Sequence, residues 1–273
     1  GPFRDAIGKP LYEDGKWDHI DPTVMIDDDG QAWLMWGNPQ VYYLKLNPDM
    51  ISYQGEVGRL DMTEQAFGGP MMGKREKGKQ YKDSYVEGPW LTKRQGTYQL
   101  LYAAGGVPEH ISYSTASHPT GPWNYAGQIM PLSDTKSFTN HCGVADYKGH
   151  SYFFYHTGKL PNGGGFGRSV AVEEFKYNAD GSFPTILPTD EGVKPIATFN
   201  PFRKVEAETM AFSKGIKTEQ GDGVGVYVSD IHNGDYIKLQ NVAFGKLPPR
   251  TFTARVASGL RGGQLVICLD SIN

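Results

Sequence analysis

Along most of the 273-residue chain, apolar residues alternate with polar ones or form short runs between turns. Glycine and proline mark these turns, and no segment carries the 3.6-residue period of a sustained helix. Three of the runs predict half-buried strands, each entered through a glycine turn, at 31–36, 97–102 and 151–156. The pattern therefore predicts an all-β protein.

Each of these strands belongs to a longer repeated block. The blocks open with three polar phrases, Ile-Asp-Pro at 20–22, Glu-Gly-Pro-Trp at 87–90 and Asn-His-Cys-Gly at 140–143. Their turn glycines are 66 and 53 positions apart, an interval that fits one four-stranded propeller blade with variable loops. The repeat gives Asp21, Glu87 and His141 one equivalent position, which in a radial fold is a polar site on the axis.

A different style of sequence begins after a proline-containing connection near residue 198. Its strands are predicted with a period of two, typical of a β-sandwich, at 223–228, 233–239, 252–258 and 263–270. We divide the chain into 1–197, about three blades of a propeller, and 198–273, a partial β-sandwich. The opening residues match the end of a blade, and 263–270 matches a strand that continues into a hairpin. We therefore expect both domains to extend beyond this chain.

The charge balance narrows the classes of partner. The chain has 27 basic and 30 acidic residues, a formal net charge of −3, and no basic run, which argues against nucleic acid and anionic membranes. Its two cysteines, Cys142 and Cys268, form no metal spacing or disulfide framework. A glycine-rich stretch at 162–167 precedes no helix, which argues against a nucleotide site. We expect no organic cofactor. The 16 Tyr, 13 Phe and 5 Trp suit both strands and sugar faces.

The ordered phrases, together with Gly-Arg-Ser-Val at 167–170, resemble glycoside hydrolase family 43. Val-Glu-Ala-Glu at 205–208 and Asn-Gly-Asp-Tyr at 233–236 resemble the start of a family 6 carbohydrate-binding module. The first resemblance implies a five-bladed propeller that cleaves α-L-arabinofuranosyl or β-D-xylosyl linkages of arabinoxylan or xylan with inversion. It further implies a secreted or periplasmic enzyme whose partner is plant cell-wall polysaccharide.

The resemblance also implies roles for single residues. Glu87 corresponds to the general acid and Asp21 to the carboxylate that modulates the pKa of that acid. His141 corresponds to the histidine that reaches an axial metal ion, usually calcium, and Arg168 to an arginine that contacts the sugar. The general base is expected before residue 1, so this chain by itself is expected to be nearly inactive.

Acid catalysis gives a physical reason for two neighbouring carboxylates. A general acid must carry its proton near neutral pH, whereas a free glutamate does not. A second carboxylate close by disfavours the charged form and raises the pKa of the acid. We therefore expect Asp21 to lie beside Glu87 and the pKa of Glu87 to be raised.

Other candidates bind sugar or metal. Trp36 and Trp90 can stack on a sugar ring, but each fits a blade core equally well. By the resemblance, Tyr227 lies in the sugar cleft of the module. Glu206 and Glu208 alternate on one strand face and match structural calcium ligands of such modules.

Plainer interpretations compete with some of these. The acidic run at 27–29 ends in glycine between two strands, so we predict a hairpin turn rather than a metal site. His156 ends an aromatic strand and is expected to pack. For the whole protein, the alternative is a non-catalytic sugar-binding propeller fused to a binding module. A fructan- or sucrose-type propeller fits the phrases less well.

Overall fold

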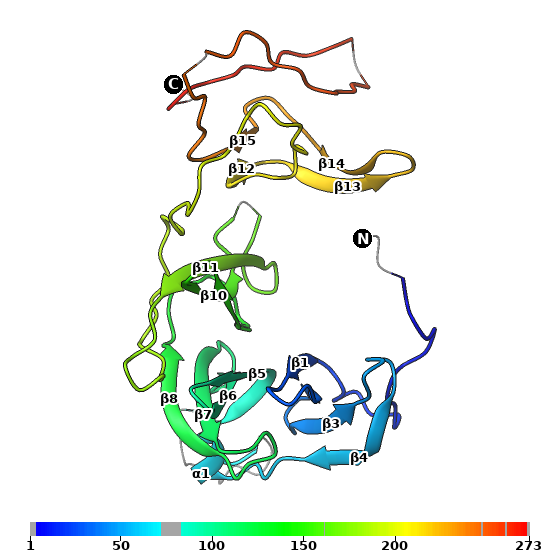
Figure 1. Ribbon diagram of the computed structural model, residues 1–273, viewed down its shortest axis with the longest axis vertical. Helices are drawn as coiled ribbons and strands as arrows, with labels where there is room; N and C mark the ends of the chain where they lie inside the picture. Colours follow the sequence, from blue (N-terminus) through cyan, green and yellow to red (C-terminus); the bar gives the residue numbers. More distant parts are fainter. Residues whose placement is uncertain (1–3, 72–82, 161, 247, 260, 272–273) are drawn as a thin grey trace. The chain divides into compact units, whose positions relative to one another are not determined.

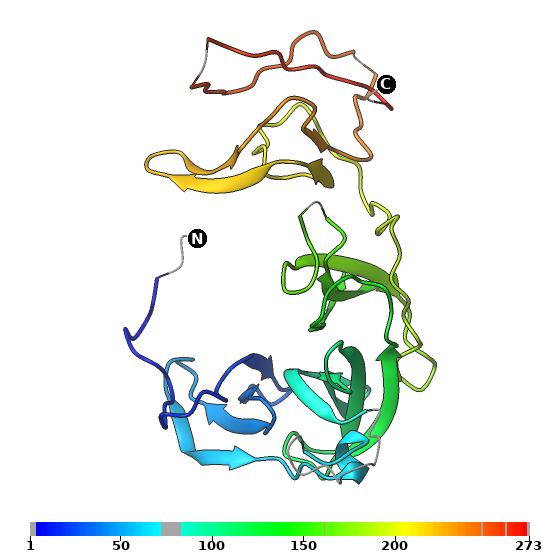
Figure 2. The ribbon, with the colours of Figure 1, turned by 180° about the vertical axis from the view of Figure 1, so that it is seen from behind.

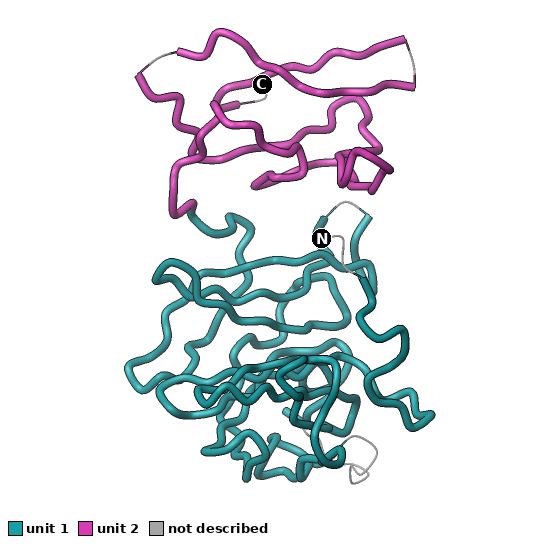
Figure 3. Tube along the Cα trace, turned by 45° about the vertical axis from the view of Figure 1, so that its right-hand side comes forward, with its two compact units in different colours: residues 1–194 teal, residues 195–273 magenta. Residues whose placement is uncertain are grey.

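The computed structural model describes residues 4–71, 83–160, 162–246, 248–259 and 261–271. The chain divides into two compact units, Gly1–Lys194 and Pro195–Asn273 (Figure 3). Regular structure is nearly all strand, since the one α-helix of the described residues is the four-residue α1, Glu64–Phe67. No described helix has the length and apolar character needed to cross a bilayer.

The first unit holds three antiparallel sheets that follow one another in chain order (Figures 1 and 2). The first contains β1 (Thr23–Ile26), β2 (Ala32–Trp36), β3 (Tyr42–Leu46) and β4 (Tyr53–Arg59). The second contains β5 (Tyr85–Arg94), β6 (Thr97–Ala104), β7 (His110–Ala116) and β8 (Asn124–Met130). The third contains β9 (Gly143–Tyr147), β10 (His150–Thr157) and β11 (Ser169–Phe175). The three strands predicted first are β2, β6 and β10, so the all-β prediction with three blade-like sheets is confirmed.

Strand β6 explains how the sheets pack together. Successive side chains of a strand point to opposite faces. Accordingly Leu100 and Tyr102 join an apolar cluster shared with the first sheet, whereas Leu101 joins a cluster shared with the third. All three side chains are fully buried. The strand was expected to be half buried, but it is covered on both faces because a sheet packs against each.

The acidic turn lies between β1 and β2, as predicted. Asp27 N–H donates to Gln31 O at 2.9 Å, and Gly30 N–H donates to Asp27 O at 2.9 Å. The Asp27 carboxylate accepts hydrogen bonds from Lys93 Nζ (2.7 Å) and from the Tyr98 hydroxyl. The turn therefore also ties the first sheet to the second.

The second unit contains two strand pairs. Strand β12 (Phe212–Lys214) pairs with β15 (Tyr236–Lys238), and β13 (Lys217–Gly221) pairs with β14 (Gly225–Ser229). The strands predicted at 252–258 and 263–270 are wrong for this structure, since neither segment forms one. A strand needs a neighbour for its backbone N–H and C=O groups. No described strand pairs with these segments, and Leu265 is 63% exposed.

Candidate active site

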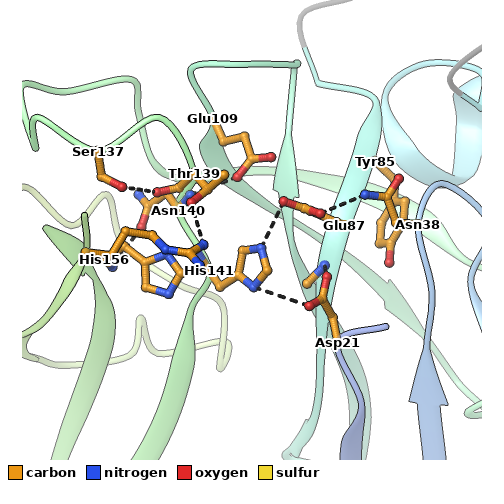
Figure 4. Close-up of polar contacts among 12 residues, drawn as sticks. Asp21, Asn38, Tyr85, Glu87, Glu109, Ser137, Thr139, Asn140, His141 and His156 are labelled. Carbon is orange, nitrogen blue, oxygen red and sulfur yellow. Dashed lines mark hydrogen bonds and ion pairs between the residues drawn. The ribbon is translucent and has the colours of Figure 1, made fainter. Parts of the chain in front are cut away.

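Asp21, Glu87 and His141 come together from the three sheets of the first unit (Figure 4). His141 Nε2 lies 3.1 Å from Glu87 Oε1, and His141 Nδ1 lies 4.0 Å from Asp21 Oδ1. One donor atom of each residue lies within 4.8 Å of the others. All three side chains are partly exposed, so the group is open to a ligand.

The backbone brings these side chains close to the start of the first strand of each sheet. Asp21 precedes β1 by two residues and adopts a left-handed φ of 59°. Glu87 lies in β5 where the pairing with β6 shifts register. Such irregularities bend a strand and redirect a side chain. His141 precedes β9 by two residues.

Gly88 allows the close approach of all three residues. Its N–H donates to Asp21 Oδ2 at 3.3 Å. Its φ is 63°, and a Cβ atom at this position would lie 2.9 Å from the His141 ring. Glycine is therefore required here both by the backbone conformation and by the packing of His141.

The electrostatics of the group correct one expectation. The hydrogen bond with His141 lowers the pKa of Glu87, against the opposing effect of burial. We expected a raised pKa, because the charge of Asp21 was considered without that of His141. Burial raises the pKa of Asp21, and the negative charge of Glu87 adds to this. Burial opposes charge on His141, but its bond to Glu87 and the charge of Asp21 raise the pKa of His141.

Two residues that the sequence did not single out complete the surroundings of Glu87. Asn38 Nδ2 donates to Glu87 Oε2 at 2.7 Å. Glu109 is only 4% exposed and lies next to Glu87 (Figure 4). Burial raises the pKa of Glu109 to about 7, and the charge of Glu87 contributes. Neither residue belongs to a repeated phrase, so no sequence signal marked them.

His156 packs, as predicted, but its partner is His141. The two rings stack with centroids 5.1 Å apart. His156 Nδ1 accepts the backbone N–H of His141 at 3.3 Å, which fixes His156 as a neutral acceptor. Burial lowers the pKa of His156 to about 4, and the charges of His141 and Arg168 act in the same direction.

The predicted sugar-contacting residues of the first unit lie in different surroundings. Arg168 Nη1 donates to Thr139 Oγ1 at 2.8 Å, and its charge acts on Asp21. Trp90 is partly buried against the cluster shared with the third sheet. Trp36 is 5% exposed and stacks on Tyr42. Trp36 thus belongs to the blade core, the second of the two interpretations given for it, and presents no face to a sugar.

In the second unit the acidic pair is arranged differently from the prediction. Glu206 and Glu208 lie in a turn, where Glu206 O accepts the N–H of Thr209 at 3.0 Å. They therefore do not share a strand face, and Glu206 pairs with Lys204 at 2.7 Å. No candidate metal group of the described residues contains either glutamate. Tyr227 lies within β14 and donates to Glu219 Oε2 at 3.1 Å.

The ligand atoms that meet at the axis can be compared with those that a calcium ion requires. Ca²⁺ takes six to eight oxygen ligands, whereas this group offers two carboxylates and one imidazole. Glu87 is already engaged by His141 and Asn38. The described residues therefore fit calcium only with a shell completed by water, with Asp21 and His141 facing it. A second group, Asp14, Asp18 and His19, lies in the segment before β1.

A carboxylate pair at the meeting point of blade-like sheets is typical of a carbohydrate-cleaving enzyme. The family model for glycosyl hydrolases family 43 matches residues 1–183, and that for carbohydrate binding module family 6 matches residues 206–273. The chain belongs to glycosyl hydrolase family 43 and carries a family 6 module region, which confirms the resemblance.

Relatives agree with this assignment. The chain is 33% identical to an arabinoxylan arabinofuranohydrolase of Bacillus subtilis (strain 168), over 99% of this chain and 57% of that protein. A Paenibacillus polymyxa protein of the same name is 30% identical, over 99% and 46%. A crystal structure of the Bacillus subtilis enzyme with cellotetraose covers 90% of this chain and 55% of its own, with 27% identity and a TM-score of 0.70. The chain thus spans about half the length of these relatives.

One further solved structure concerns the metal. It is a family 43 β-xylosidase/α-arabinofuranosidase from a compost microbial metagenome, in complex with xylotriose and in a calcium-free form. It is 26% identical and covers 62% of this chain and 58% of its own, with a TM-score of 0.52. The calcium-free form of this relative links calcium to at least one member of the family.

Proposed function

We propose that the protein hydrolyses α-L-arabinofuranosyl or β-D-xylosyl linkages of arabinoxylan or xylan, with inversion. The observation that carries the proposal is the meeting of Asp21, Glu87 and His141 from three successive sheets. Membership of family 43 and the names of the relatives support the substrate class. The polysaccharide is too large to enter a cell intact, so we place the enzyme outside the cytoplasm, secreted or periplasmic.

In this proposal Glu87 is the general acid that protonates the leaving oxygen. Without substrate its bond to His141 favours the carboxylate. A bound sugar excludes water from the site, which disfavours the charge and raises the pKa of Glu87. The negative charge of Asp21 acts in the same direction. Asp21 thus acts as the modulator, while Asn38 and His141 hold the Glu87 carboxyl in place.

The water-activating base is proposed to lie upstream of residue 1, in a sheet that continues the ring. An inverting site separates its two carboxyls by about 6.5–9.5 Å, which leaves room for the attacking water. Asp21 is too close to Glu87 for this arrangement, because their nearest donor atoms lie within 4.8 Å. In this proposal this chain supplies the acid half of the site, and a preceding segment supplies the base half.

Sugar contacts are proposed for Arg168 and Trp90 in the first unit and for Tyr227 in the second. The positive charge of Arg168, like that of His141, lowers the pKa of Asp21, and a guanidinium donates well to hydroxyl oxygens. Trp90 and Tyr227 are partly exposed, so each offers aromatic surface to a ring.

We further propose that a calcium ion binds at the axis near Asp21 and His141 through water molecules. When bound, the ion would supply positive charge beside the two carboxylates.

The test is release of 4-nitrophenol from its α-L-arabinofuranoside and β-D-xyloside. This chain is compared with the full-length protein that contains it. We expect turnover by the full-length protein, no more than a trace by this chain, and loss of turnover in Glu87→Gln. Binding of arabinoxylan without turnover by the full-length protein would instead identify a non-catalytic sugar-binding propeller.

A further inference from the structure

Glu109 holds the segment that delivers His141 to the site. It lies in the loop before β7 and is buried between the second and third sheets. Its backbone N–H donates to Phe138 O at 3.0 Å. Its carboxylate Oε2 accepts the backbone N–H of Asn140 at 2.8 Å. Glu109, from the loop that leads into the second sheet, therefore forms hydrogen bonds with two residues just before His141.

The same segment is held from the opposite side by β10. The Asn140 side-chain oxygen accepts the N–H of His156 at 3.1 Å, and His156 Nδ1 accepts the N–H of His141 at 3.3 Å. The backbone at Asn140 and His141 is thus fixed between Glu109 and His156. This arrangement sets the height of the His141 ring above Gly88 and its distance from Glu87.

The second oxygen of Glu109 differs from that of a purely structural buried carboxylate. Oε1 is buried and accepts no hydrogen bond from a described donor, and the interaction of the Glu109 side chain with Glu87 contributes to the raised pKa of Glu109. An unsatisfied buried polar atom is costly. Glu173 provides the comparison, because it is 8% exposed and both its oxygens accept hydrogen bonds, from the Tyr155 hydroxyl and from Thr189. Glu173 is a satisfied structural carboxylate, whereas one oxygen of Glu109 accepts from no described donor and the side chain faces Glu87.

We propose that Glu109 is a positioning residue for the reaction, which holds the 138–140 segment so that His141 meets Glu87 at bonding distance. The inference rests on the proposed function, in which Glu87 is the general acid. It assigns Glu109 an effect on turnover rather than on substrate binding, because Glu109 is buried behind the groups that face the ligand.

The experiment measures kcat and KM of the full-length protein on arabinoxylan oligosaccharides. Glu109→Gln keeps an oxygen that can accept the Asn140 N–H, and Glu109→Met removes it at similar volume. We expect Glu109→Gln to stay within about threefold of the parent. We expect Glu109→Met to lose about 10- to 100-fold in kcat with KM nearly unchanged, since small displacements of catalytic groups have effects of this size.

Glu173→Met is the matched control, because it removes a buried carboxylate whose hydrogen bonds go to Tyr155 and Thr189 rather than to the 138–140 segment. It should lower Tm and leave kcat unchanged. The inference is overturned by full kcat in Glu109→Met. It is also overturned by a loss of about tenfold or more in Glu109→Gln, a result that can be measured even where Glu109→Met does not fold. Glu87→Gln is measured in parallel. Its full activity would overturn the proposed function, whereas an inactive Glu87→Gln beside an active Glu109→Met would overturn only the role of Glu109.

Discussion

His141 Nε2 and Glu87 Oε1 lie 3.1 Å apart and form a hydrogen bond that joins the third sheet to the second. Both atoms belong to residues that open a repeated sequence block. The bond lowers the pKa of Glu87, so it favours the ionised form of Glu87 in the ligand-free protein. The protonation state of Glu87 therefore depends on the groups that surround this pair.

Replacement of Asn38 by aspartate should move the pH dependence of activity. Asn38 donates to Glu87 at 2.7 Å, and a carboxylate there would place a like charge against the acid. A like charge raises the pKa of Glu87, so Glu87 keeps its proton to higher pH. We expect the alkaline limb of kcat/KM for Asn38→Asp to rise by about one pH unit. Asn47→Asp, in the β3–β4 turn, is the control. A limb that stays in place or falls contradicts the prediction.

Substitution of Gly88 by alanine should reduce activity more than stability. A Cβ atom would lie 2.9 Å from the His141 ring at a φ of 63°. Gly96 has a φ of 79° with nothing within 4 Å of such an atom, so Gly96→Ala reports the backbone strain alone. Both variants should lose about 1–2 kcal/mol of unfolding free energy from the left-handed conformation.

Only Gly88→Ala should also lose about tenfold or more in kcat/KM, because His141 is displaced. Urea unfolding and steady-state kinetics measure the two effects. Equal kinetics in the two variants would show that contact with His141 has no role in turnover.

Glu109 should make the protein less stable as pH rises. Its pKa is raised from 4.5 to about 7 in the folded state. Below pH 4.5 both states hold the proton, and the stability contribution is complete. Between pH 4.5 and 7 the unfolded state releases its proton first, so stability falls with pH, by about 3 kcal/mol in all. Glu109→Gln should lack this decline in urea unfolding at pH 4.5 and 8. If the unfolding free energies of the parent and of Glu109→Gln fall equally between pH 4.5 and 8, Glu109 is not the group responsible.

Calcium should raise Tm through the axial group. An ion present at about 100 times its Kd stabilises the folded state by about 2.7 kcal/mol, a rise of several degrees that EDTA should reverse. His141→Ala should abolish the rise, and Asp18→Asn should retain it. Thermal melts of the three proteins measure the effect. Loss of the rise in Asp18→Asn alone would place the ion in the segment before β1 instead.

The sequence predicted the three central residues because they share a place in a repeat. Asp21, Glu87 and His141 each lie near the start of the first strand of a sheet, and the alternating strands with their glycine turns mark that position in each block. The hairpin turn at 27–29 was predicted from the same kind of pattern. Such local patterns can be recognised in the sequence without knowing what the sheets pack against.

The remaining features depend on contacts between sheets, which no local pattern records. Asn38 and Glu109 reach Glu87 and Asn140 from loops that are 49 and 31 residues distant in sequence. Trp36 fits a sugar contact or a blade core equally well by sequence, and it is buried because Tyr12 and His19, from the segment before β1, pack on it. The pKa of Glu87 was predicted with the wrong sign because the charge of His141 was left out. In the second unit, alternation at 263–270 predicted a strand, but pairing also requires a neighbour.

The central claim is that Glu87 protonates the leaving oxygen, and leaving-group dependence tests it most directly. The full-length protein and Glu87→Gln are compared on arabinoxylan oligosaccharides and on the matching 2,4-dinitrophenyl glycoside, whose leaving group departs without a proton. We predict that Glu87→Gln loses about 10²–10⁴-fold in kcat on the oligosaccharide and far less on the activated glycoside. An equal loss on both substrates, or no loss on either, would contradict the account.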